Sequence, residues 1–164
     1  MAAFEWRRGD GVCIEPWRHF CALMSLTVGQ QTGKGAADEV IAVTKAQWAA
    51  EMPKNTGEAM KSLADDYTEL NSEYSTRIEG KTIAMRLAEA TASGSGSLVA
   101  AEMANPKVQV YGDVAILSYN FAGVTKDKDG KIENTRAKST RVYVKQGGQW
   151  RLVHANFGAD PLPK

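Results

Sequence analysis

The sequence has 164 residues, which is enough for one domain with a complete hydrophobic core and short for two. Its 43% hydrophobic and 24% charged residues are typical of a globular protein, and its net charge of +1 comes from mixed acidic and basic residues. These features argue against a nucleic-acid-binding protein, which needs a basic stripe, and against a membrane protein, which needs an apolar run of roughly eighteen residues.

Residues 1–35 are predicted to be an extension that precedes the domain. Two interpretations are open for residues 1–29: a secretory signal, in which a basic segment precedes the short apolar stretch Phe20–Gly29, or an irregular tail. A cytoplasmic location is favoured, and the signal would instead imply a secreted or periplasmic protein. Cys13 and Cys21 form no CxxC pair and do not indicate a zinc site.

Three helices are predicted in the first half of the domain. The first spans Ala36–Met52, because apolar residues recur there at spacings of three and four. A second, short helix at Glu58–Ala64 leads to a candidate strand at Tyr67–Tyr74. Gly80 then precedes the third helix, Lys81–Ala92.

The last third of the chain predicts a meandering antiparallel sheet. Turns of a few residues separate its runs of β-branched and aromatic residues, and connections this short join only antiparallel neighbours. The first strand is expected to start at Leu98 and to bend near Asn105 and Pro106, because proline cannot donate to a sheet. The runs are Val108–Val110, Val114–Thr125, Lys131–Lys145 and Trp150–Phe157.

The order of these elements predicts an α+β domain over residues 36–161. Helices that gather on one face of a curled antiparallel sheet leave its concave side closed, and such a side tends to enclose a pocket. Large apolar side chains occupy both faces of the predicted strands. Both faces are therefore expected to be covered, one by the helices and the other by a second copy of the chain.

Two segments of this sheet, NPKVQVYGDVAILSY and STRVYVKQGGQWRLVHANFGADP, resemble a known family. They are similar to the C-terminal half of the association (hub) domain of calcium/calmodulin-dependent protein kinase II. That domain is a member of the cone-shaped, cystatin-like superfamily of nuclear transport factor 2, with the SnoaL-like polyketide cyclases and the ketosteroid isomerases. The match is most specific at Asn105-Pro106, Gly112, Tyr119, Thr140-Arg141-Val142, Gly148, Trp150, Val153-His154 and Gly158.

The resemblance implies three helices on the concave side of the sheet, a homodimer or higher homo-oligomer, and a pocket inside each cone. No kinase motif precedes the matching region, so a stand-alone protein is expected, as many bacterial members are. Of the family's pocket arginines only Arg141 is matched, and Phe121 and Phe157 stand where the family has the other two. The pocket should therefore be less cationic and more aromatic, for a small, partly apolar ligand.

Two sets of residues follow from this assignment. The expected ligand-binding set is Trp48, Tyr67, Tyr119, Phe121, Arg141, Tyr143 and Phe157. The expected dimer interface is Val142, Trp150, Leu152 and His154. A buried guanidinium needs an anion or hydrogen-bond acceptors, so Arg141 has two open interpretations: an anchor for a ligand, or a partner of Glu69, Glu73 or a backbone carbonyl.

The leading hypothesis is a non-catalytic, homo-oligomerising domain with a ligand pocket. The alternative is an isomerase or cyclase that acts on a small hydrophobic carbonyl compound without a cofactor, with Arg141 and a tyrosine stabilising charge. Such an enzyme needs a carboxylate base. The resemblance places Asn71 at that position, where an amide cannot take a proton, and leaves Glu69 or Glu73 as substitutes. A buried carboxylate with a raised pKa would favour this alternative.

Other chemistries have little support in the sequence. The chain has two histidines, His19 in the extension and His154 on a strand, so neither a catalytic triad nor a catalytic metal site is expected. Ser93–Ser97 lacks the third glycine and the following helix of a phosphate-binding loop, and it is expected to be a flexible connection. No cofactor or metal is therefore predicted.

Overall fold

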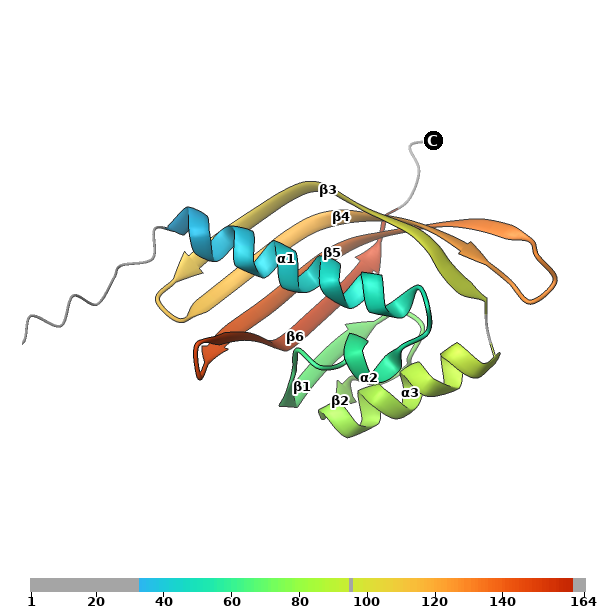
Figure 1. Ribbon diagram of the computed structural model, residues 1–164, viewed down its shortest axis with the longest axis horizontal. Coiled ribbons are helices and arrows are strands. Elements are labelled where there is room, and N and C mark those ends of the chain that lie inside the picture. Colours follow the sequence, from blue (N-terminus) through green and yellow to red (C-terminus); the bar gives the residue numbers. More distant parts are fainter. Residues whose placement is uncertain (1–32, 95, 161–164) are drawn as a thin grey trace, which may run out of the picture. The chain divides into compact units, whose positions relative to one another are not determined.

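The computed structural model describes residues 33–94 and 96–160, and the predictions for residues 1–32, with their signal interpretation and both cysteines, lie outside the described residues. Figure 1 shows the elements along the chain. The helices are α1 (Gly33–Glu51), α2 (Thr56–Ala59) and α3 (Lys81–Gly94). The strands are β1 (Leu63–Asn71), β2 (Ile78–Glu79), β3 (Ser97–Tyr111), β4 (Val114–Lys126), β5 (Ile132–Gln146) and β6 (Gln149–Ala159).

The strands form one six-stranded sheet in the order β2-β1-β6-β5-β4-β3. The predicted antiparallel meander is confirmed for β3 to β6, which pair with their neighbours in sequence order. The pairing of β1 with β6 is parallel, so the sheet is mixed. The parallel pairing is possible because the chain between these two strands is long enough for a crossover.

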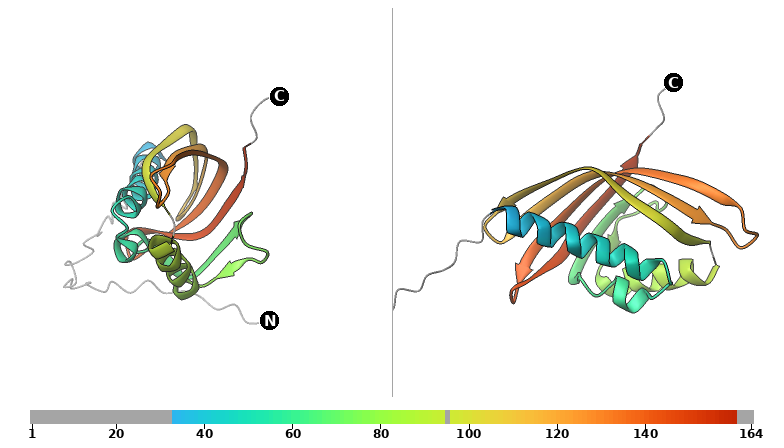
Figure 2. Two further views of the ribbon diagram at one scale, coloured as in Figure 1. Left: turned by 90° about the vertical axis from the view of Figure 1, so that its right-hand side faces the viewer. Right: turned by 45° about the horizontal axis from the view of Figure 1, so that its top comes forward.

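All three helices lie on the concave side of the curved sheet, as predicted (Figures 1 and 2). Helix α1 runs across this side and contacts β3, β4 and β6, whereas α3 packs against β1, β2 and α2. No helix among residues 33–94 and 96–160 is long and apolar enough to cross a membrane.

Strand alternation explains which side chains form the core. On β4 and β5 the residues that point toward α1 are buried, and those between them are at least partly exposed. Tyr143 of β5 is fully buried, and its hydroxyl lies 2.7 Å from the hydroxyl of Thr44 on α1. This contact joins the helix to the centre of the sheet with both polar groups satisfied.

The bend predicted in β3 is confirmed. The register with β4 shifts between Ala104 and Lys107, and Asn105 there has a φ of 51°. A left-handed residue followed by Pro106 takes this segment out of the ladder without ending the strand.

Three predicted boundaries in the helical half are wrong: the end of the second helix, and the start and end of the first strand, which finishes at Asn71 and not at Tyr74. The second helix ends at Ala59, and Leu63 and Ala64, which were assigned to it, begin β1. Both residues are buried, and Leu63 pairs with Leu152 of β6. A long-range strand pairing thus overrides the local helical pattern at this point.

Trp150 and Leu152 lie on the concave face, so the prediction that they face outward toward a second copy is wrong. Trp150 is 5% exposed, and its indole N–H donates to a carboxylate oxygen of Glu39 on α1 at 2.8 Å. Leu152 is 1% exposed. Both side chains belong to the core of a single chain.

A bulge in β6 is the physical reason for this error. Val142 pairs with His154, but the next residue of β5, Tyr143, pairs with Leu152, so β6 holds an extra residue at this point. Strict alternation puts Leu152 and His154 on one face, and the extra residue separates them. Of the four predicted interface residues, Val142 and His154 remain on the outer face.

Candidate functional site

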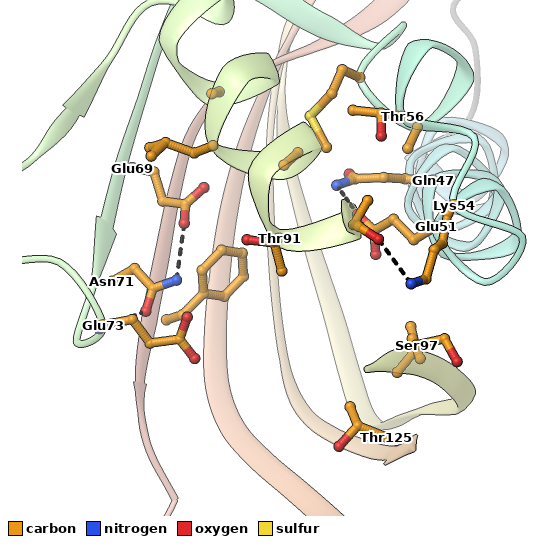
Figure 3. Close-up of a pocket in the computed structure, with 18 of the residues that line it drawn as sticks. Gln47, Glu51, Lys54, Thr56, Glu69, Asn71, Glu73, Thr91, Ser97 and Thr125 are labelled. Carbon is orange, nitrogen blue, oxygen red and sulfur yellow. Dashed lines mark hydrogen bonds between the residues drawn. The ribbon is translucent and has the colours of Figure 1, made fainter. Parts of the chain in front are cut away.

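A cavity of about 790 Å³ lies between β1, the last turn of α1, α2, α3 and one end of β3 to β5. This volume is within the range of small-molecule pockets. Its walls combine apolar and aromatic side chains with several carboxylates (Figure 3). The cavity therefore has room for an organic ligand and groups that would orient it.

The structure brings only part of the predicted ligand-binding set to this cavity. Tyr67 and Phe157 line it. The other five lie on the concave side or on α1 but pack against each other away from the cavity: Trp48, Tyr119, Phe121, Arg141 and Tyr143. The Trp48 ring fills the space between α1 and the sheet beside these residues. Its centroid lies 5.7 Å from that of Tyr119 and 5.4 Å from that of Phe121.

Arg141 is 4% exposed and is held by neutral groups. Its Nε donates to the hydroxyl of Tyr119 at 2.9 Å, and one terminal nitrogen donates to Oε1 of Gln47 at 2.6 Å. Its guanidinium carbon lies 5.3 Å from the centre of the Phe157 ring. Among the described residues no carboxylate forms an ion pair with Arg141, so the interpretation in which Arg141 pairs with Glu69 or Glu73 is not supported.

Gln47 connects this buried cation to the cavity. Its carbonyl oxygen accepts from Arg141, and its amide nitrogen donates to Oε1 of Glu51 at 2.8 Å. Gln47 and Glu51 are four residues apart on α1, a spacing that places them on the same side of the helix. The amide therefore lies between a positive group and a negative one and satisfies both.

Glu51 is a partly buried carboxylate at the cavity wall. Burial raises the pKa of Glu51, the hydrogen bond from Gln47 and the charge of Arg141 lower it, and the charge of Glu69 raises it, with a net upward shift. Desolvation of the charged form is thus the dominant effect. A carboxyl group of this kind can hold or release a proton closer to neutral pH than an exposed glutamate.

Across the cavity, β1 presents Tyr67, Glu69 and Asn71, which are alternate residues and share one face of the strand. Figure 3 shows Glu69 and Asn71 side by side on this wall. The hydroxyl of Tyr67 donates to Oε2 of Glu69 at 2.6 Å, and Nδ2 of Asn71 donates to Oε1 at 3.1 Å. Burial and the adjacent Glu69 raise the pKa of Tyr67, so its phenol stays protonated. Both oxygens of Glu69 are therefore fixed by neutral donors.

Gln47 and Glu51 are the functional candidates that the sequence analysis missed. They lie one position before Trp48 and Met52 of the apolar stripe used to predict this helix. Polar residues that flank a buried stripe at the same spacing border the core, and this pattern is the signal that points to them.

The outer face of the sheet forms a second candidate surface. Its apolar centre consists of Val114 and Ile116 on β4 and Val142 and Val144 on β5, all of them partly exposed. No helix of the described residues covers this face (Figure 2). Next to it, Nδ1 of His154 lies 2.9 Å from the hydroxyl of Thr68.

Within the described part of the chain, no three His, Cys, Asp or Glu residues gather closely enough to hold a metal ion. Three of the carboxylates that line the cavity stand on opposite walls, with Glu51 on α1 and Glu69 and Glu73 on or next to β1 (Figure 3). This arrangement suits an organic ligand that reaches from one wall to the other.

Comparison with known proteins identifies the type of fold. Residues 36–161 match the model of the calcium/calmodulin dependent protein kinase II association domain. The association domain of C. elegans CaMKII is 21% identical, with a TM-score of 0.64 over 77% of this chain and 97% of that one. The Chlamydomonas CamKII hub homology domain is 22% identical, with a TM-score of 0.64 over 77% of this chain and 99% of that one.

A nuclear transport factor 2-like protein from Salmonella enterica is 15% identical, with a TM-score of 0.70 over 80% of this chain and 96% of that one. These structures have the same fold as the described domain. No curated protein matches the chain.

Proposed function

The chain belongs to the calcium/calmodulin dependent protein kinase II association domain family, and on this premise we propose that it is a non-catalytic, homo-oligomerising domain with a cavity for a small, partly apolar ligand. The observation that carries the assembly half is the apolar centre of the outer face, which the helices leave uncovered. A second copy of the same face would remove these side chains from water. The cavity lies on the opposite, concave side and stays open in such a pair.

The substitution Val142→Glu tests the proposed pairing. It places a carboxylate in the centre of the outer face, and a two-fold interface would bring two such charges together in a desolvated place. We expect the dimer to weaken by about 100-fold or more, since opposed like charges cost several kcal/mol. Light scattering coupled to gel filtration would show a monomer at micromolar concentration.

Ile132→Glu is the matched control, because it makes the same change on the same strand at a residue that is 55% exposed and outside the apolar centre. This variant should keep the mass of the wild type. A monomeric wild type, or a Val142→Glu variant that stays dimeric, would contradict the proposed interface. Thermal unfolding by circular dichroism confirms that both variants are folded.

A second candidate function is favoured by one observation, the partly buried Glu51 with its raised pKa at the cavity wall. Asn71 has no basic group, and both oxygens of Glu69 already accept hydrogen bonds. Among the described residues the carboxyl group of Glu51 accepts one hydrogen bond, from Gln47, and Glu51 is therefore the candidate base for removing a proton beside a carbonyl group. In this role the protein would be an isomerase or cyclase acting on a small hydrophobic carbonyl compound.

Deuterium exchange into the methyl group of acetophenone, followed by NMR, tests this second candidate. An enzyme should exceed the buffer rate, and Glu51→Gln should reduce the rate by about 100-fold. The base must be ionised, so the rate should rise with pH through the raised pKa of Glu51 and then level off. Glu58→Gln, on the exposed side of α2, should leave it unchanged. Exchange at the buffer rate would rule out this function for that class of ketone.

A further inference from the structure

We propose that Gln47 sets the charge preference of the cavity: it screens the guanidinium of Arg141 and presents Glu51 instead, so that the cavity takes a ligand with a protonated amine rather than a carboxylate. This inference rests on the proposed ligand cavity and is independent of the proposed dimer. Its basis is the hydrogen-bond chain from Arg141 through Gln47 to Glu51, together with the charges around the cavity.

The screening of Arg141 follows from its contacts. Arg141 is not among the residues that line the cavity, whereas Gln47 and Phe157, which touch its guanidinium group, both line it. Their side chains therefore separate the cation from a ligand. A carboxylate would have to displace the Gln47 oxygen, which lies 2.6 Å from the guanidinium nitrogen, before it could pair with Arg141.

The carboxylates of the inner walls are open to a cationic partner. Glu51 and Glu69, which are partly buried, and Glu73, which is exposed, line the cavity, and none of the three forms an ion pair with another described residue. The hydrogen bonds to Glu51 and Glu69 come from neutral side chains, which bring no positive charge to either carboxyl group. A partly buried carboxylate without a cation gains from an ammonium group, because the pair replaces the hydration that the carboxylate has lost.

The cations at the rim are engaged with other groups. Nζ of Lys54 donates to the carbonyl oxygen of Ala92 at 2.8 Å. Nζ of Lys128 lies 4.0 Å from Asp129. Lys54 is thus held at the rim and Lys128 is largely exposed to solvent, so an ammonium group of the ligand would pair with the carboxylates deeper in the cavity.

Aromatic side chains complete the site. Tyr67, Tyr74 and Phe157 line the cavity together with Met60 and Leu87. Their surfaces suit an apolar or aromatic body on the ligand, and ring faces also attract an ammonium group. The complementary ligand is therefore an amine with a hydrophobic body, a compact class of amphipathic cation.

The test uses a matched pair of probes, 4-phenylbutylamine and 4-phenylbutanoate, with 4-phenylbutanol as the neutral member. Titration calorimetry at neutral pH compares their affinities for the full chain. We expect the amine to bind about ten-fold or more tightly than the carboxylate, as charge-assisted hydrogen bonds predict. Equal affinities, tighter binding of the carboxylate, or no binding of the amine in the millimolar range would overturn the proposal.

Variants of Glu51 and Gln47 test whether these two residues cause the preference for the amine. Glu51→Gln keeps the shape and the acceptor oxygen but removes the charge. It should lower the affinity for the amine by about ten-fold. Gln47→Ala opens a path to Arg141 and should raise the affinity for the carboxylate probe by a similar factor. Glu58→Gln, an exposed glutamate outside the cavity, is the control and should change neither affinity.

The result is separable from the proposed assembly, since light scattering reports the dimer for every variant. A dimeric protein without the amine preference would contradict the inference about Gln47 and leave the proposal of a dimer standing. A monomer that prefers the amine would do the reverse. If Gln47→Ala does not fold, the comparison of the two probes on the wild type and on Glu51→Gln still decides the question.

Discussion

Replacement of Trp150 by alanine is expected to lower the free energy of unfolding by about 3–5 kcal/mol, the usual cost of removing a large aromatic side chain from a core. The indole is 5% exposed and donates to Glu39 of α1, and Nζ of Lys145 lies 5.3 Å from the ring centre. Its loss leaves a cavity under the first half of α1. Urea unfolding followed by circular dichroism measures the change.

The same experiment separates the two possible faces for this residue. Trp150→Phe keeps most of the ring volume and should cost much less than the alanine variant. An outward-facing Trp150 would instead give a dissociated dimer with a nearly unchanged free energy of unfolding of the monomer. That outcome would contradict the bulge in β6, which turns this side chain toward the helix.

Gln47→Leu is expected to lower the free energy of unfolding by about 2–3 kcal/mol, because it removes an acceptor from a buried cation. Arg141 keeps the hydroxyl of Tyr119 and the face of Phe157 but faces a methyl group where it had an oxygen. Gln47→Ala should cost less, since water from the cavity can then reach the guanidinium group. Chemical unfolding at neutral pH gives both values.

A double-mutant cycle with Arg141→Met identifies the cause. If the cost of Gln47→Leu comes from the unsatisfied guanidinium, most of it should disappear when the cation is removed as well. Gln146→Leu, at an exposed end of β5, controls for the change of side chain and should stay within about 0.5 kcal/mol of the wild type. Additive effects in the cycle would show that Gln47 and Arg141 are not coupled.

The antiparallel strands could be predicted because the residue patterns that specify them lie within each strand and its adjoining turns. Period-two patterns and short glycine turns define β4 and β5, and the same alternation places Tyr119, Arg141 and Tyr143 on one face. The bulge in β6 has no comparable signal, because it depends on the pairing with β5 and not on the residues around Leu152. The errors at Trp150 and Leu152 follow from that one extra residue.

The candidate site was less predictable, because it depends on where helices dock on the sheet. The family resemblance selects Arg141 but does not reveal that Trp48 fills the space beside it. It also does not show that Gln47 separates Arg141 from the open cavity. The row Tyr67, Glu69 and Asn71 follows from strand alternation, but its position opposite Glu51 requires the packed helices.

The parallel pairing of β1 with β6 has a consequence for how the domain folds. The meander from β3 to β6 can form through successive hairpins between neighbouring strands. By contrast, β1 pairs with β6, which lies more than eighty residues later in the chain (Leu63 pairs with Leu152). Such a distant closure carries a high entropic cost and slows folding. During synthesis, β1 and β2 therefore lack their pairing with β6 until almost the whole domain has left the ribosome.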